Sequence, residues 1–347
     1  MTKDRFTAES VAFGVCSIVG LIGLGLGTFH ILPSSLWQDE LYTLANFVLK
    51  GPAVVVTDYH VPNNHIFSNL LSTIFAPLAP QSPVVARTVS LLSVIAIGAV
   101  AVCLRNSRTN RFGAAVLLLV VGVTMELQYL LLQLRGYGLL FALTLLFCLA
   151  LRSSATHWAA LALGVLMAYT LPTALIFPVT AFLLMAVVTG ERRYLFANLY
   201  LLCGVALLYA PVARQLLAVQ SRYSQRWGEQ FGDPEVLVEF VRFYCLPYVQ
   251  RDIRTVVVFV TCAVLLLALI RGLLRSDPVD RALSGAVAAT LAAFFVLKTP
   301  PLRTAVFLIV PLAMLVGRLI SEVFNSTSRP KLFATSMAGL AVYLFAI

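Results

Sequence analysis

The sequence has few charged residues and no long polar stretch. Only 12% of its 347 residues are Asp, Glu, Lys or Arg, which is about half the usual share in a soluble protein. Hydrophobic residues make up 60% of the chain, and its mean hydropathy is +0.92. These values exclude a soluble globular protein. The formal net charge of +10 does not indicate nucleic-acid binding, because no soluble basic domain exists to carry it.

Cysteine is also sparse, and no two cysteines form a CxxC pair. Five of the six lie in apolar stretches, where a free cysteine behaves as a small core residue. Thiolate zinc sites and dithiol redox sites are therefore not expected. Repeats, low-complexity tracts and Gly-rich phosphate loops are absent as well, since the glycines of 23–27 lie in an apolar run. The cysteines are Cys16, Cys103, Cys148, Cys203, Cys245 and Cys262.

What the chain has is a series of apolar runs near the ~20 residues that a helix needs to cross a bilayer. Backbone groups in lipid must be hydrogen-bonded within the segment, so each run should be a helix. We expect an all-α, polytopic integral membrane protein with about eleven transmembrane helices and one catalytic domain, 1–347. The first run is too long and unbroken for a signal peptide. The expected spans are 9–31, 84–104, 112–130, 136–151, 158–170, 172–189, 195–212, 254–274, 282–297, 302–320 and 332–347.

The basic residues indicate the orientation of these spans. If the N-terminus lies inside, every inner loop is short and basic, as the positive-inside rule requires. A small majority of the 25 basic residues then lies inside. Residues 32–83 and 213–253 form the two long outer loops. The outer cations need a partner, which is either ordinary anionic headgroups or an anionic, phospholipid-like substrate.

The first outer loop contains adjacent acids, Asp39 and Glu40. Ser35 and Gln38 fit a capping box, which predicts a helix that starts at Ser35 and ends at Gly51-Pro52. Its apolar spacing indicates an amphipathic helix in the membrane interface. Carboxylates at a membrane edge are costly to dehydrate and are therefore candidates for function. The alternative is that both acids only stabilise the start of the helix.

A second polar cluster follows in the same loop. Residues 58–65 read Asp-Tyr-His-Val-Pro-Asn-Asn-His, and a second interfacial helix with an apolar face is expected after Pro62. Such a cluster can bind a divalent metal, orient a sugar hydroxyl or cap a helix. Asn63 or Asn64 as the N-cap is the structural alternative, and the spacing of His60 and His65 matches no known ligand signature.

Further polar residues lie at the outer ends of helices. The second outer loop interleaves cations and aromatics in 222–227 and predicts a helix after Pro234. This loop either covers a substrate cavity or is a plain connector. Arg135 and Arg303 begin the fourth and tenth expected spans, with Lys298 close by. Instead of binding substrate, both arginines could extend to the lipid headgroups. For Arg135, an ion pair with Glu126 is a second alternative.

The order of these motifs resembles the GT-C superfamily of membrane glycosyltransferases, in the branch of protein O-mannosyltransferases and lipid A aminoarabinose transferases. Five segments carry the likeness. Residues 37–40 lie in the first outer loop, and residues 60–65 resemble the family's His-Pro-Pro segment. The other three are 86–87, 135–137 and 302–311, which includes Pro311. The likeness covers roughly residues 8–320. Val61 replaces the first proline, and Thr304 stands where the family often has tyrosine. No soluble outer domain, as many relatives carry, is evident.

The resemblance implies transfer of a sugar from a polyprenyl-phosphate donor to a lipid, glycan or protein hydroxyl, on the outer side of a bacterial inner membrane. Asp39 would be the base, as one carboxylate near the hydroxyl suffices, with Glu40 as a second catalytic acid. A single base and in-line attack give inversion. No cofactor is required, although a divalent metal could assist. The rival classes are a flippase or transporter of a lipid-linked sugar and a non-catalytic scaffold. Substrate binding is assigned to His60, Asn64, His65, Arg87, Arg135, Tyr137, Lys298 and Arg303.

Overall fold

A computed structural model describes residues 3–104, 107, 110–153, 157–227, 241–242, 251–296, 302–327 and 330–346. Over these residues the chain is helical and contains no strand, so the all-α class is confirmed. The principal helices are α1 (Lys3–Ile31), α6 (Thr88–Cys103), α7 (Arg111–Val123), α8 (Met125–Leu132), α9 (Tyr137–Ala150), α10 (His157–Thr170), α11 (Ile176–Thr189), α12 (Arg192–Tyr209), α15 (Arg251–Leu274), α16 (Pro278–Val296), α17 (Ile309–Ser326) and α18 (Pro330–Ala346), with 3-10 turns η5 (Pro172–Leu175), η6 (Ala210–Val212) and η7 (Leu302–Leu308).

The number of membrane spans differs from the expectation. Five helical segments of the described chain are long and apolar enough to cross a membrane, and a sixth is added if α7 and α8 form one span bent by 90°. This supports a membrane protein, but eleven spans are not confirmed. Most of the other expected spans are apolar helices of 10–17 residues. The expected span 112–130 is divided at Thr124, where the backbone is extended.

The helices pack closely through glycine. Gly23 of α1 faces Gly122 of α7 so closely that a Cβ on Gly23 would lie 2.2 Å from the Gly122 carbonyl oxygen. Small residues allow such close approach between membrane helices. The Gln128 side chain also donates to the Gly122 oxygen, at 2.7 Å, beside the bend between α7 and α8. Gly20 and Gly23 of the first apolar run thus serve helix packing.

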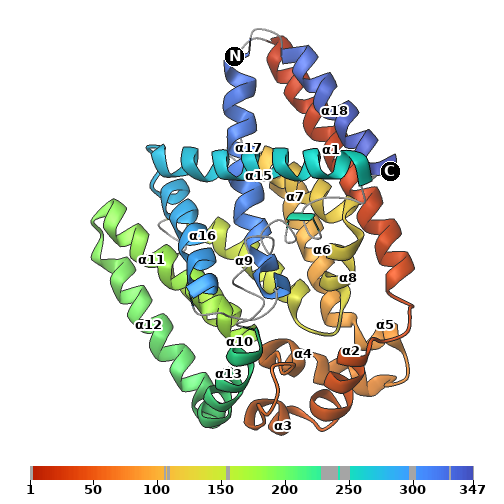
Figure 1. Ribbon diagram of the computed structural model, residues 1–347, viewed down its shortest axis with the longest axis vertical. Helices are drawn as coiled ribbons and strands as arrows, with labels where there is room; N and C mark the ends of the chain where they lie inside the picture. The colour runs from red at the N-terminus through yellow and green to blue at the C-terminus, as the bar shows by residue number, and fades with distance from the viewer. Residues whose placement is uncertain are drawn as a thin grey trace.

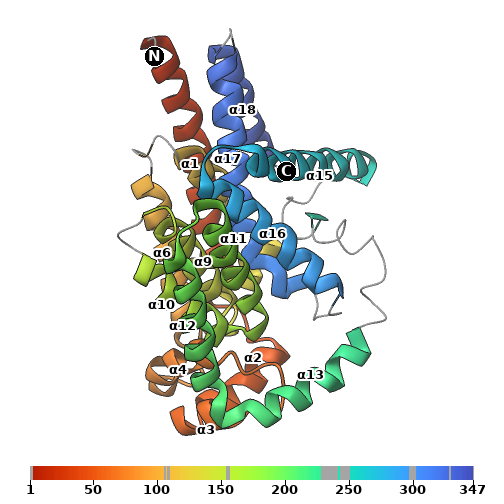
Figure 2. The same ribbon diagram turned by 90° about the vertical axis from the view of Figure 1, so that its left-hand side faces the viewer.

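Figures 1 and 2 show how the elements are arranged. In both views α15 lies across the other helices, and the short helices α2–α4 lie at the lower end of the molecule, away from α15. We call this end, residues 32–87 together with α13 (Ala213–Trp227), the loop end. Its short elements are α2 (Gln38–Thr43), the π-helix η1 (Leu44–Val48), α3 (Pro52–Thr57), α4 (Ile66–Phe75), η2 (Ala76–Leu78) and α5 (Pro83–Ala86).

The loop end forms the expected helices with different caps and faces. α2 begins at Gln38, not at Ser35, and the Trp37 N–H donates to the Glu40 side chain at 3.0 Å. Gly51, with φ 93°, precedes α3, so the first helix stops where expected. The N-cap of α4 is His65, not Asn63 or Asn64. The face of α4 toward the protein is partly polar, because Ser68, Asn69 and Ser72 are buried while Ile74 is exposed.

The two outer loops meet at the start of α13. The Gln215 side chain donates to the Thr57 carbonyl at 3.2 Å and accepts from the Tyr59 N–H. α13 therefore contacts the segment that follows α3, so the start of the second outer loop lies at the loop end. A later described residue of that loop, Val241, packs against Val258 of α15 instead. The helix expected after Pro234 lies outside the described residues.

A charged cluster joins helices α9, α15, α16 and α17. Asp280, which is only 1% exposed, contacts Arg152, Arg275 and Arg318 at 2.7, 3.3 and 3.3 Å. Around it, Arg318 also contacts Asp277 at 3.1 Å, and Arg275 contacts Glu322 at 2.8 Å. These arginines all belong to the set that the charge pattern assigns to the inner side. Their charges are thus met by acids within the protein.

Candidate functional site

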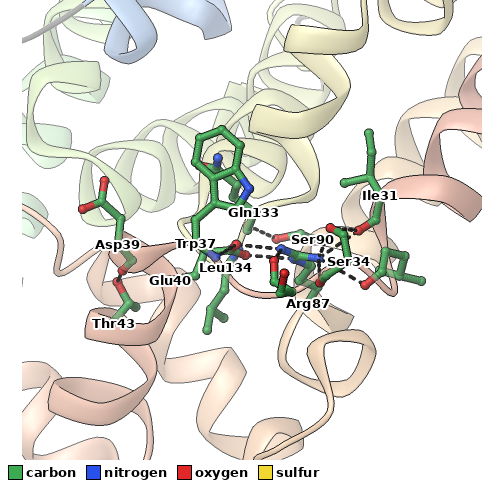
Figure 3. Close-up of polar contacts among 12 residues, drawn as sticks. Ile31, Ser34, Trp37, Asp39, Glu40, Thr43, Arg87, Ser90, Gln133 and Leu134 are labelled. Atoms are coloured by element: carbon green, nitrogen blue, oxygen red, sulfur yellow. Dashed lines mark hydrogen bonds and ion pairs between the residues drawn. The ribbon is translucent and has the colours of Figure 1, made fainter.

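The adjacent acids of α2 point to different sides of the helix. Neighbouring residues on a helix do not face the same way, and Figure 3 shows Asp39 directed away from the pair formed by Glu40 and Arg87. Glu40 is fully buried, whereas the Asp39 side chain is 45% exposed. The two carboxylates therefore have separate roles.

Glu40 and Arg87 form a buried, bidentate ion pair. Arg87 Nε donates to Glu40 Oε1 at 2.9 Å, and Nη2 donates to Oε2 at 2.7 Å. Leu134 N–H also donates to Oε1, at 2.8 Å. Arg87 Nη1 donates to the carbonyls of Ile31 and Ser34, both at 2.9 Å. Such a pair resists disruption, since removing one partner leaves a buried charge.

This arrangement gives Glu40 and Arg87 a structural task. Each is saturated with hydrogen bonds, and Arg87 joins the end of α1 to α2 and to the start of α6. The geometry therefore favours a structural role for both residues over the catalytic role expected of Glu40 and the substrate-binding role expected of Arg87. Sequence reasoning could not identify the pair, because its members lie 47 residues apart.

Asp39 lies in a separate polar array. Its Oδ2 accepts from Arg135 Nη1 at 2.8 Å and lies 3.5 Å from Arg303 Nη1. Among the described residues, its Oδ1 accepts a single, long contact of 3.4 Å from the Asn63 amide nitrogen. The Asn63 amide oxygen accepts from Arg135 Nη2 at 2.9 Å. The array thus joins α2, the segment before α4, the start of α9 and η7. Two guanidinium groups face one carboxylate, which leaves an excess of positive charge.

Arg135 is held in place by a left-handed backbone turn at Gly136 and by its own side-chain contacts. Gly136 has φ 70°, a left-handed conformation that strains other residues. A Cβ there would lie 2.9 Å from the Ser68 side chain. Arg135 is 3% exposed, pairs with Asp39 instead of Glu126, and lies over the Tyr137 ring at 5.5 Å. Arg135 therefore does not snorkel to headgroups. Tyr137 itself is buried and serves as its support.

His65 is a buried imidazole next to this array. It is 2% exposed, its ring meets Tyr137 edge-on at 5.1 Å, and neither ring nitrogen has a hydrogen-bond partner among the described residues. Burial, and then the charges of Arg135 and Arg303, lower the pKa of His65 well below 6.5. His65 is therefore neutral, with one donor and one acceptor nitrogen unsatisfied.

Asn64 has a structural role. Its amide nitrogen donates to the carbonyls of Val55 and Asp58 at 2.8 and 2.7 Å, and its oxygen accepts from Asn69 at 2.9 Å. Asn64 is 1% exposed and fully bonded. It shapes the segment that carries Asn63 and His60, and the geometry does not favour the substrate contact expected of it.

His60 belongs to a hydrogen-bonded chain that the sequence did not reveal. Its Nδ1 lies 2.5 Å from Asp58 Oδ1, and its Nε2 lies 2.7 Å from the Tyr42 hydroxyl. His60 is 45% exposed, so solvent reaches the chain. Tyr42 lies on the expected interfacial helix, where an aromatic residue is usual at the membrane edge. Its position three residues after Asp39, on the same side of a helix, is the signal that could have pointed to it.

Other expected site features are placed as follows. Lys298 lies outside the described residues. Within the described parts of the chain, no three His, Cys, Asp or Glu side chains come together to bind a metal. Arg303, at the start of η7, is 38% exposed, so it is the more accessible of the two cations at Asp39.

An apolar groove with a volume of about 970 Å³ lies between α1 and α6. Leu24, Thr28 and Leu32 line it on one side, and Leu91 and Val94 on the other. The groove ends near the loop end, because Arg87 binds the Leu32 carbonyl at 3.2 Å. Its lining is suited to a hydrocarbon chain.

The chain was also compared with known proteins. No protein-family model, no curated protein and no solved structure matches it.

Proposed function

We propose that this protein transfers a sugar from a polyprenyl-phosphate donor to a hydroxyl acceptor at the loop end, on the outer face of a bacterial inner membrane. The observation that supports the proposal is the Asp39 carboxylate, which is 45% exposed and lies between Arg135 and Arg303. A carboxylate oxygen that holds only a long contact, as Oδ1 does with Asn63, suits the base that a hydroxyl nucleophile requires. The excess positive charge beside it suits a leaving phosphate.

The reaction follows from these contacts. Asp39 Oδ1, whose contact with Asn63 is long, takes the proton of the acceptor hydroxyl. The acceptor oxygen bonds to the anomeric carbon as the bond from that carbon to the phosphate oxygen breaks. The electron pair stays on the polyprenyl phosphate, next to Arg303. One base and in-line attack invert the anomeric carbon.

The groove between α1 and α6 supports a lipid-linked donor. It is apolar, and its end at Leu32 lies beside the loop end. A prenyl chain in it would bring the phosphate toward the membrane edge, where α2 lies.

The test is Asp39→Asn, which keeps the shape of the side chain and removes its basicity. With a panel of farnesyl-phosphate hexoses, we expect wild type to release farnesyl phosphate and Asp39→Asn to lose this release while still binding donor. Arg192→Ala, an exposed substitution on α12, is the control that should retain wild-type release. Release by Asp39→Asn at the wild-type rate would contradict the assignment. Movement of intact conjugates across vesicles without release would favour a flippase.

A further inference from the structure

Asp58, His60 and Tyr42 form a chain of three polar groups at the exposed surface of the loop end. Ionised Asp58 can only accept hydrogen bonds, so the contact of 2.5 Å requires a proton on His60 Nδ1. In neutral His60, Nε2 is then an acceptor. In this neutral tautomer, the Tyr42 hydroxyl, 2.7 Å away, donates its proton to Nε2. The oxygen of Tyr42 is therefore left with free lone pairs and no free proton.

The same two segments carry Asp39 and this chain. α2 provides Asp39 and Tyr42, three residues apart on one side of the helix. The segment before α4 provides Asn63, which contacts Asp39, and His60, which contacts Tyr42. Two contacts between these segments thus place Tyr42 and the proposed base on the same side of α2, both facing the segment before α4.

The rings around His60 fix its orientation. Phe47 and Tyr42 lie 5.4 and 6.2 Å from the imidazole, by ring centroids. Among the described residues, the charged side chain in contact with the imidazole is Asp58, on the same segment. An imidazole oriented by a carboxylate on one nitrogen defines the hydrogen-bonding direction of the group on the other.

We propose that Asp58 and His60 are positioning residues that make the Tyr42 oxygen an acceptor for a hydroxyl group of the transferred sugar. Tyr42 is then a residue that contacts substrate and contributes to specificity, since an acceptor favours a hydroxyl and disfavours an anion or a fluorine at that position. This inference rests on the proposed transfer reaction. It names the substrate class as a neutral, hydroxyl-bearing sugar.

The first measurement tests the chain without any substrate. In protein labelled with ¹⁵N-histidine, the His60 signal, assigned from its loss in His60→Gln, should show the tautomer protonated on Nδ1. Asp58→Asn should shift that equilibrium toward the Nε2 tautomer, whereas Asp277→Asn, in the charged cluster, should leave it unchanged. A wild-type His60 protonated on Nε2 would overturn the hydrogen-bond direction on which the proposal depends.

The second measurement tests the contact with the sugar. Among the farnesyl-phosphate hexoses, the best substrate is compared with its monofluoro analogues, in which each free hydroxyl in turn is replaced. Wild type should reject one analogue about ten-fold in kcat/KM, a loss typical of one hydrogen bond. Tyr42→Phe should turn over the parent conjugate more slowly and should no longer discriminate against that analogue. Tyr200→Phe, on α12, is the control and should keep both the wild-type turnover rate and the discrimination.

The outcomes separate the two claims. If Tyr42→Phe discriminates like wild type, the contact at Tyr42 is wrong while sugar transfer stands. If wild type neither binds nor cleaves any conjugate, the proposed function fails, and the contact at Tyr42 fails with it. The tautomer of His60 then still decides whether the chain exists as described.

Discussion

At the residue scale, Arg303 has a different position from an arginine that snorkels. Its guanidinium lies 3.5 Å from Asp39 and is 38% exposed, so an incoming phosphate could reach it. Arginine binds phosphate by two parallel hydrogen bonds, and lysine copies this fork poorly. This contrast makes Arg303 the sharpest probe of donor binding in the described chain.

We expect Arg303→Ala to weaken donor binding about ten- to a hundred-fold, because one charge-assisted contact is worth about 1.5–3 kcal/mol. Arg303→Lys should recover only part of this loss. Titration of a farnesyl-phosphate hexose against wild type, both variants and Arg192→Ala measures the effect. Equal affinity in all four proteins would mean that Arg303 does not contact the phosphate.

The buried His65 predicts an acid-sensitive fold. Its pKa in the folded protein lies below its usual 6.5, chiefly through burial. Below pH 6.5 the unfolded chain therefore binds a proton that the folded protein does not, and stability falls as the pH falls. Thermal unfolding of purified protein between pH 8 and 5 should show this loss. His65→Phe should reduce it, while His30→Phe, an exposed control, should not.

How far the residues could be assigned from sequence depends on the range of their contacts. The sequence could single out Asp39 as a candidate site residue, because an acid at a membrane edge is unusual in such an apolar chain. Its partner Arg135 lies 96 residues away, and no local pattern gives that distance. The same holds for Glu40 and Arg87. Asn64 looked like a cap or a ligand because its type fits both, and only the packing shows its three internal hydrogen bonds.

At the element scale, the bend between α7 and α8 is the main departure from the sequence reading. Hydropathy is continuous through 112–130, and no proline marks the bend. The bend is stabilised by Gln128, which donates to the Gly122 carbonyl, and by the contact between α1 and α7. Hydropathy reliably predicts that apolar helices are present. The positions at which they bend or break depend on tertiary contacts of this kind.

The close contact of α1 and α7 gives a testable consequence. Gly23→Ala places a methyl group 2.2 Å from the Gly122 oxygen, so the backbones must separate. Overpacking of this kind typically costs about 1–3 kcal/mol, and the thermal midpoint should fall. Gly25→Ala is the matched control, since its Cβ would meet no atom within 4 Å. Equal midpoints for the two variants would contradict this packing.

At the scale of the whole molecule, polar chemistry is divided between two regions. The loop end carries the exposed acid with two arginines, whereas the charged cluster around Asp280 satisfies its charges internally. The charge pattern assigns these regions to opposite sides of the membrane. A site that recruits an external anion should have unmatched cations, and the array at Asp39 meets this condition.

This orientation can be measured by labelling. In a cysteine-free background, a membrane-impermeant maleimide should label Lys50→Cys, beside α3, in intact cells. It should label Ser276→Cys, beside the charged cluster, only after the membrane is opened. Both positions are exposed. Labelling of both variants in intact cells, or of Ser276→Cys alone, would contradict the orientation.

The bond from Leu134 N–H to Glu40 has a consequence for biosynthesis. Arg135 also binds Asp39, so two adjacent pairs of contacts join residues 39–40 to residues 134–135, about 94 residues further along the chain. A chain leaving the ribosome therefore exposes Asp39 and Glu40 long before their partners are made. Until then, Glu40 can pair with Arg87 alone, and Asp39 has no cation from residue 135. Asp39 thus gains its contact with Arg135 only after about two fifths of the chain has been made, and its contact with Arg303 only after about seven eighths.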